Sequence, residues 1–188
     1  GTADAVVTAA SADEAASLAA SFETFIKQEA KISGNAELSD KTVTFHVVGK
    51  GAHGASPQSG INAATFLATF LNDYSFAEGA YSFINTIAEF IHEDFYGEKL
   101  GVAFEDEKMG KLTMNAGIVN FDPENPENSL VTLNFRYPKG TSAEELQAKV
   151  QATVGETVTA TQGDRNQEPH YVPVDDPLVA TLLQDRKS

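Results

Sequence analysis

The sequence predicts an α+β protein in which helices pack on mainly antiparallel sheet. Apolar and polar residues alternate over 42–48 and 130–137, which is the two-residue period of a strand with one buried face. Apolar residues recur three and four positions apart over 63–71, as expected for a helix with one buried stripe. The segments follow one another as strand, helix, strand, helix, strands, helix and strand, an order that favours this fold class.

The first half opens with a short strand predicted over 4–8 and a helix with a defined start. Ser11 is expected to be the N-cap of that helix, and Glu14 completes a capping box three residues later. We expect the turn residues Ser33, Gly34 and Asn35 to end the helix. A weak strand at 36–38, a turn at 39–41 and the clear strand over 42–48 come next.

The second half is predicted to contain more strand. The predicted elements, in order, are a helix over 80–95, two strands over 102–105 and 111–121 around a turn at 106–110, a loop at 122–128, a strand over 130–137, a helix capped by Thr141 or Ser142, and a strand over 156–161. Beyond Gly163 three prolines predict irregular chain, with an apolar turn near 178–183 and Asp175 and Asp176 capping it.

Composition limits the classes of partner. A length of 188 residues suits one domain or two small packed subdomains. The formal charge of −14 argues against nucleic acid or an anionic membrane as partner. The chain has no cysteine, no apolar run that could cross a bilayer and no signal-peptide pattern, so we expect a cytoplasmic protein.

The chain is organised around the segment GKGAHGASPQSGIN, residues 49–62, between a predicted strand and a predicted helix. Glycines permit close backbone approaches, and Pro57 fixes φ where the chain turns toward the helix. A histidine at such a junction, here His53, can present a ring nitrogen beyond the sheet edge. From the residues alone, His53 is either such a functional group or a structural histidine at a strand end.

With the following alanine, this segment resembles the G-x-x-x-H-x-x-x-P-x-x-G-x-N-A motif of a family of zinc-dependent exopeptidases. The motif lies in the lid or dimerisation domain of that family, which includes aminoacylases, succinyl-diaminopimelate desuccinylase and bacterial dipeptidases. Within the family, the sequence of this segment is most similar to that of the PepV-type dipeptidases. The resemblance implies two ferredoxin-like subdomains. Residues 1–41 with parts of the centre would imitate a partner subunit, 42–163 would form the dimerisation-like subdomain, and 164–188 would lead back to a catalytic domain absent from this sequence.

The resemblance also implies roles for individual residues. The family's matching histidine reaches the substrate carbonyl, so His53 is expected to stabilise the oxyanion. Arg136 shares a strand face with Thr132 and Asn134, where a charge indicates an anionic partner, either an acid of the protein or a ligand. The resemblance makes that ligand the C-terminal carboxylate of a peptide. Weaker candidates are Asn128 and Asn115, and the expected supporting residues are Gly51, Gly54, Pro57, Gly60 and Asn62.

No metal site is expected in this chain. The four histidines (His46, His53, His92 and His170) are scattered, and no H-E-x-x-H pattern occurs. Neither Ser56 nor Ser59 lies in a G-x-S-x-G elbow, which argues against a serine nucleophile. The resemblance implies two zinc ions in the catalytic domain of the parent protein.

These expectations combine into one function and one alternative. The chain resembles the lid of a dizinc dipeptidase, with the parent catalytic domain and a short peptide as its partners. Alone it should be inactive, and it should be monomeric because its two halves occupy the surface through which relatives dimerise. The alternative is a non-enzymatic ferredoxin-like module for binding or dimerisation.

Overall fold

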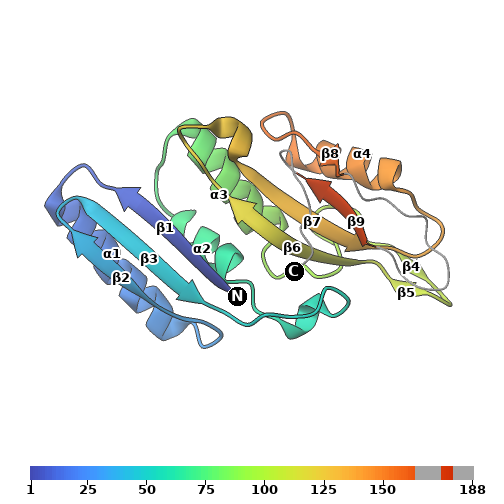
Figure 1. Ribbon diagram of the computed structural model, residues 1–188, viewed down its shortest axis with the longest axis horizontal. Helices are drawn as coiled ribbons and strands as arrows, with labels where there is room; N and C mark the ends of the chain where they lie inside the picture. The colour runs from blue at the N-terminus through green and yellow to red at the C-terminus, as the bar shows by residue number, and fades with distance from the viewer. Residues whose placement is uncertain (164–174, 180–188) are drawn as a thin grey trace.

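The computed structural model describes residues 1–163 and the backbone of residues 175–179 (Figure 1). The helices are α1 (Ala12–Gln28), α2 (Ala63–Leu71), α3 (Glu78–Phe90) and α4 (Ala143–Val154), with short 3-10 turns η1 (Pro57–Ser59) and η2 (Pro126–Asn128). The strands are β1 (Thr2–Thr8), β2 (Ser33–Ser39), β3 (Thr42–Val48), β4 (Glu105–Asp106), β5 (Gly110–Lys111), β6 (Thr113–Asn120), β7 (Leu130–Arg136), β8 (Thr161–Gln162) and β9 (Asp175–Val179). No helix in the described ranges is long and apolar enough to span a membrane.

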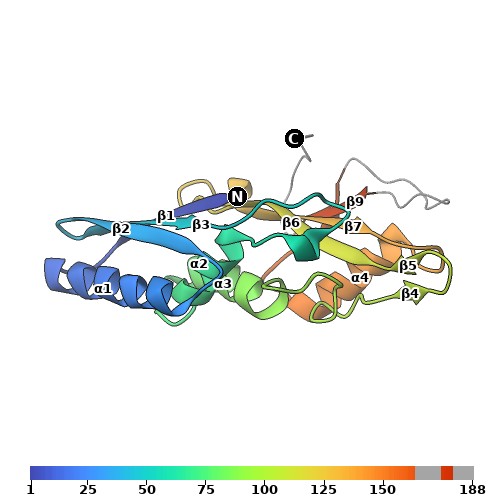
Figure 2. The same cartoon turned by 90° about the horizontal axis from the view of Figure 1, so that it is seen from below.

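The strands form two antiparallel sheets and a hairpin. One sheet has the order β1-β3-β2, the other has the order β6-β7-β9-β8, and β4 pairs with β5. The four helices of the described residues lie on the same side of the two sheets (Figure 2). The predicted α+β class is therefore confirmed.

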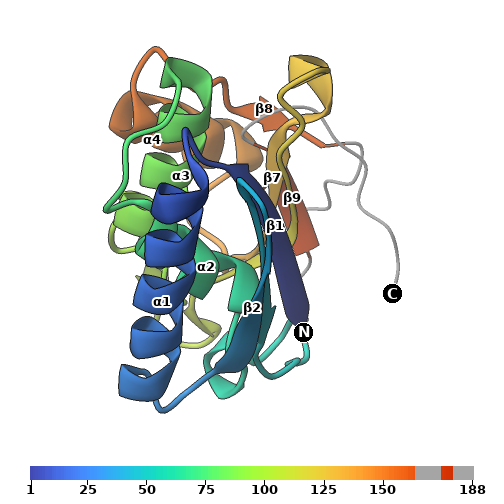
Figure 3. The same cartoon turned by 90° about the vertical axis from the view of Figure 1, so that its left-hand side faces the viewer.

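The first core lies between the three-stranded sheet and helices α1 and α2 (Figure 3). Alternate residues of β3, namely Val43, Phe45 and Val47, are buried as their spacing predicts. Phe22 of α1 lies at the centre, with its ring 4.8 Å from that of Phe45 and 5.2 Å from that of Phe70. Full burial of such a side chain contributes about 1.5–3 kcal/mol, so these rings fix α1 against the sheet.

The second core lies between the four-stranded sheet and helices α3 and α4. Strand β7 contributes Val131, Leu133 and Phe135 to it, again at alternate positions. Ile84 of α3 packs against both cores and so connects the two halves.

Both predicted N-caps are confirmed in the structure. Ser11 Oγ accepts a hydrogen bond from the backbone N–H of Glu14 at 3.1 Å, and Ser142 Oγ accepts one from Glu145 at 3.2 Å. The Glu14 carboxylate accepts a bond from the N–H of Ala10 rather than that of Ser11, so the capping box reaches one residue further back than expected.

The expected end of the first helix is wrong. The helix ends at Gln28, and Ser33–Ser39 is strand β2. Gly34 is needed there for a different reason from a helix cap, since a Cβ at this position would lie 2.2 Å from the carbonyl oxygen of His46. The close approach of β2 to β3 therefore requires glycine at position 34, whereas the sequence pattern attributed this glycine to a helix end.

The strand expected over 156–161 is also wrong in extent, because only Thr161–Gln162 is strand. Glutamine side chains of α4 take the hydrogen bonds that a sheet would have made. Gln151 donates to the carbonyl of Val158 at 2.7 Å and accepts from the N–H of Ala160 at 2.8 Å, and Gln147 donates to the carbonyl of Ala160 at 3.0 Å.

The third helix is shorter than predicted and ends at Phe90. Two residues beyond it oppose continuation. Glu93 has a left-handed backbone (φ 54°), and the carboxylate of Asp94 accepts hydrogen bonds from the N–H groups of Tyr96, Glu98 and Lys99. The strand expected over 102–105 is correspondingly short, since only Glu105–Asp106 pairs, with Gly110–Lys111 across the predicted turn.

The predicted division of the chain stays a prediction. The boundary near residue 42 falls within the three-stranded sheet, where β3 pairs with both β1 and β2. Of the proposed linker, residues 164–174 and 180–188 lie outside the described residues. Residues 175–179 form β9 beside β7, so Asp175 and Asp176 lie in a strand and do not cap a helical turn as expected. The rest of the expected turn, 180–183, lies outside the described residues.

Candidate functional site

The segment 49–62 forms a loop that is closed at its base. Lys50 and Ile61 exchange two backbone hydrogen bonds, of 2.9 and 2.8 Å, in an isolated bridge. Within the loop, Pro57 is buried at the first position of η1. The closed base and the buried proline hold the tip in a fixed position relative to β3 and α2.

Two glycines of this loop are required by close contacts. A Cβ on Gly49 would lie 2.2 Å from the carbonyl oxygen of Ile61, and a Cβ on Gly60 would lie 2.6 Å from the Cβ of Ala52. Gly51, by contrast, has no neighbouring atom within 4 Å of the position of an added Cβ. The closed base therefore depends on Gly49 and Gly60, whereas Gly51 is not required by packing.

His53 lies at the exposed tip of the loop. Its ring Nδ1 accepts a hydrogen bond from the N–H of Ala55 at 3.2 Å, and its carbonyl accepts one from Ser56 at 2.8 Å. A neutral imidazole that accepts at Nδ1 carries its proton on Nε2. The bond from Ala55 thus leaves Nε2 as the donor of the neutral, exposed ring.

Arg136 is the last residue of β7 and is partly buried. Its guanidinium lies beside the loop tip, because Nη2 is 3.8 Å from where a Cβ of Gly54 would be. The neighbouring Ala55 and Arg136 line one cavity of about 200 Å³. The structure therefore brings the segment that carries His53 to Arg136, although the two lie far apart in the sequence.

Asn62 connects this loop to the second half of the molecule. Its side-chain oxygen caps α2 by accepting from the N–H groups of Ala64 and Thr65 at 3.1 and 3.3 Å. Its Nδ2 donates to the carbonyl of Ala116 at 3.0 Å, where the β6–β7 register shifts. Asn62 thus fixes the C-terminal end of the loop against β6.

The two weaker candidates lie elsewhere. Asn128 is the exposed last residue of η2, just before β7, and roughly 20 Å of strand separates that end of β7 from Arg136 at its other end. Its carbonyl accepts a hydrogen bond from Asn120 at 2.8 Å. Asn115 lies on β6 opposite Asn134. On this face of the sheet, the next pair along the strands is Thr113 and Arg136. Asn115 is therefore near the site, whereas Asn128 is not.

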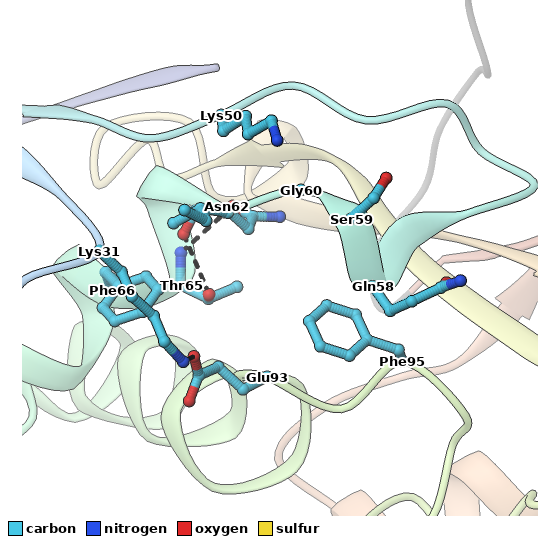
Figure 4. Close-up of a pocket in the computed structure, with 11 residues that line it drawn as sticks. Lys31, Lys50, Gln58, Ser59, Gly60, Asn62, Thr65, Phe66, Glu93 and Phe95 are labelled. Atoms are coloured by element: carbon cyan, nitrogen blue, oxygen red, sulfur yellow. Dashed lines mark hydrogen bonds and ion pairs between the residues drawn. The ribbon is translucent and has the colours of Figure 1, made fainter.

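A larger cavity, of about 270 Å³, lies at the base of the loop (Figure 4). Neither His53 nor Arg136 lines it. Lys50 stands on one side and the ion pair of Lys31 and Glu93, at 2.5 Å, on the other. The hydrogen bond from Lys31 lowers the pKa of Glu93, so this pair stays ionised near neutral pH.

Two other histidines have structural partners. His46 lies on the outer face of β3, with Nδ1 2.5 Å from the carboxylate of Asp4 and Nε2 3.6 Å from that of Glu37, and the bond to Asp4 raises its pKa. His92 contacts Thr65 Oγ1 at 3.0 Å, and burial lowers its pKa. The fourth histidine of the sequence, His170, lies outside the described residues. Within the described ranges, no three His, Asp or Glu residues converge as a metal site would require.

The part of the chain that carries the loop and β7 is similar to known proteins. Residues 39–161 match the family model described as the peptidase dimerisation domain. The chain belongs to this family. The match begins just before β3 and ends at β8, so it covers the loop, Arg136 and most of the second core.

Dipeptidases are among the relatives of this dimerisation domain. It is 39% identical over 163 residues to a Beta-Ala-Xaa dipeptidase of Lactobacillus delbrueckii subsp. lactis, and 30% identical over 163 residues to a putative dipeptidase of Staphylococcus saprophyticus. Each alignment covers 87% of the chain but only 34% of the relative. The chain thus spans about a third of the length of these relatives, and the resemblance inferred from the sequence is confirmed.

The structure of the dimerisation domain adds one residue that the sequence analysis missed. Lys111, at the end of β5, lines the cavity that Ala55 and Arg136 share. A lysine after a turn is ordinary in sequence, and its position here depends on the pairing of the next strand. Thr113 lies opposite Arg136, which brings Lys111 to the same end of β7.

Proposed function

We propose that this dimerisation domain is the lid of a zinc-dependent dipeptidase and supplies two of the groups that bind the peptide. The observation that carries the proposal is the contact of the His53 loop with Arg136, where Nη2 lies 3.8 Å from the Cβ position of Gly54. One short ligand can therefore reach both side chains. The names of the related dipeptidases support the same substrate class.

The two residues would act on different parts of the peptide. His53, with its proton on Nε2, donates a hydrogen bond to the carbonyl oxygen as it becomes negative; such a donor contributes about 2.7–4 kcal/mol to transition-state stabilisation. Arg136 binds the C-terminal carboxylate, which is already charged in the substrate. A carboxylate clamp at a fixed distance from the oxyanion donor favours short peptides.

The metal belongs, in this proposal, to the rest of a longer parent protein. Two zinc ions there would supply an activated water for attack on the peptide carbonyl. The described residues of this chain do not fit such a site, because they contain no convergent ligand group. The lid's contribution is to bind and orient the peptide. We also propose that the parent is cytoplasmic, and that the lid is monomeric with the parent catalytic domain as its partner.

A hydrolysis assay tests this function. The purified 188-residue chain and a full-length parent are each incubated with dipeptides under three conditions. These are no treatment, addition of a chelator, and restoration of zinc after chelation. We expect turnover by the parent alone, lost with the chelator and recovered with zinc. Turnover by the isolated chain would contradict the lid role. A parent without peptidase activity would instead favour the alternative, a binding or dimerisation module.

A further inference from the structure

The cavity beside Arg136 is formed by three parts of the chain that meet at the end of β7. The loop contributes Ala55, the hairpin and the start of β6 contribute Met109, Lys111 and Thr113, and β7 and its continuation contribute Arg136, Tyr137 and Pro138. Its volume is about 200 Å³. A cavity at this place can hold a side chain next to whatever Arg136 binds.

Lys111 brings a second cation to the cavity. Its Nζ lies 5.1 Å from the centre of the Tyr96 ring, an attraction that restricts the position of an otherwise mobile side chain. Glu105 lies opposite Lys111 in the β4–β5 register, yet no ion pair joins them in the described part of the chain. The charge of Lys111 is therefore available to a ligand.

The two cations of the cavity differ in their surroundings. Asp175 of β9 lies opposite Arg136 in the β7–β9 register, so Arg136 has an acid across from it. Lys111 has no ion pair within the described residues and is the second cation at this cavity. One guanidinium binds one carboxylate in a bidentate manner, so a separate lysine beside it suits a second carboxylate on the same ligand.

We propose that Lys111 determines specificity by binding the side-chain carboxylate of peptides that end in Asp or Glu. This inference rests on the proposed function, in which Arg136 holds the C-terminal carboxylate. The cavity then holds the side chain of the C-terminal residue, with Lys111 at its hairpin side and Met109 and Thr113 along it.

The test compares two substrates of nearly equal size, Ala-Glu and Ala-Gln, in the full-length protein. The measured quantity is the ratio of their kcat/KM values. Lys111→Met removes the charge but keeps an unbranched side chain over Tyr96, and we expect it to lower the ratio about five- to tenfold, as for loss of an accessible charge-assisted hydrogen bond. Lys111→Arg should largely preserve the ratio. Lys108→Met, in the same hairpin but outside the cavity lining, should leave it unchanged.

A binding measurement separates failure of this inference from failure of the proposed function. N-acetylglutamate and N-acetylglutamine are titrated into the 188-residue chain while backbone amide NMR signals are followed. We expect shifts at Met109 and Thr113 with N-acetylglutamate that are lost in Lys111→Met. A parent that cleaves no dipeptide overturns the function, whereas these shifts would still support the site. An unchanged substrate ratio, or equal binding of both compounds to wild type and Lys111→Met, overturns the inference.

Discussion

The Asn62 side chain donates a hydrogen bond to the carbonyl of Ala116 at 3.0 Å and thereby joins α2 of the first half to β6 of the second. The same side chain caps α2 through its oxygen. Asn62 lies at the end of the loop that carries His53, and β6 pairs with the strand that ends at Arg136. One amide therefore fixes the distance between the two proposed peptide-binding segments.

Asn62→Ala should destabilise the domain by about 2 kcal/mol, since it removes a helix cap and a hydrogen bond between the halves, each worth about 1 kcal/mol. Asn62→Asp separates the two contributions. Aspartate caps a helix as well as asparagine does, but it cannot donate to Ala116 and places a charge against that carbonyl. Urea unfolding should therefore show a clear loss for Asn62→Asp as well. Wild-type stability in Asn62→Asp would show that the bond to Ala116 contributes little.

The loop glycines provide a matched pair of substitutions. Gly60→Ala places a Cβ 2.6 Å from the Cβ of Ala52 and 3.0 Å from the carbonyl oxygen of Lys50, so the base of the loop must shift. We expect a loss of about 1–3 kcal/mol in the free energy of unfolding. Gly51→Ala, in the same loop but with open space, should change it by less than about 0.5 kcal/mol. Equal effects of the two variants would show that the loop base is not closely packed in solution.

The His46 cluster predicts a pH-dependent contribution to stability. Asp4 of β1 and Glu37 of β2 face His46, and the bond to Asp4 raises its pKa. A raised pKa means that the folded state holds the proton more tightly, so the contribution is present below the ordinary histidine pKa, about 6.5, and is lost as pH rises through the folded value. The stability difference between wild type and His46→Gln should therefore be larger at pH 5.5 than at pH 8.5.

His92 provides a control, because its pKa is shifted in the opposite direction from that of His46. Burial lowers its pKa, so below about pH 6.5 the unfolded chain binds the proton that the folded chain resists. Wild type should lose stability relative to His92→Asn as the pH falls from 7.5 to 5.5. Parallel pH profiles for His46→Gln and His92→Asn would contradict at least one of the two assignments.

The parts of this structure that the sequence predicted depend on local chemistry. The alternation of Val43, Phe45 and Val47 and the cap at Ser11 are each set by a few neighbouring residues. The predictions are wrong where a segment far away in the sequence determines the local backbone structure. Gly34 is dictated by a carbonyl of β3, and residues 158–160 bond to glutamines of α4 instead of a strand.

The candidate site also combines features that the local sequence predicts with features that depend on distant segments. The motif around His53 was recognisable because all its residues are close in sequence. The contact of that loop with Arg136, and the position of Lys111 beside it, follow from the strand register and from the packing of the two halves, which no local pattern encodes. The position of Asn128, by contrast, could have been inferred from the sequence, because the strand predicted over 130–137 already separates the loop at 122–128 from Arg136, and β7 has nearly that extent.

The last prediction treats His53 and Arg136 as a pair with different effects on catalysis in the full-length parent. His53→Ala removes a donor whose partner becomes charged only in the transition state, so kcat and kcat/KM should fall by similar factors, on the order of 10²–10³. Arg136→Ala removes a contact that is already present in the bound substrate, so the effect should be largely on KM.

Amidated dipeptides provide the control for this pair. They lack the terminal carboxylate, so the difference in KM between wild type and Arg136→Ala should largely disappear with them, while the effect of His53→Ala should persist because the scissile carbonyl is unchanged. His53 is exposed at the loop tip, so His53→Ala should unfold at the wild-type urea concentration. Wild-type turnover by His53→Ala would exclude the oxyanion role. An unchanged effect of Arg136→Ala on amidated substrates would exclude the carboxylate clamp, because the guanidinium would then be acting on some other part of the peptide.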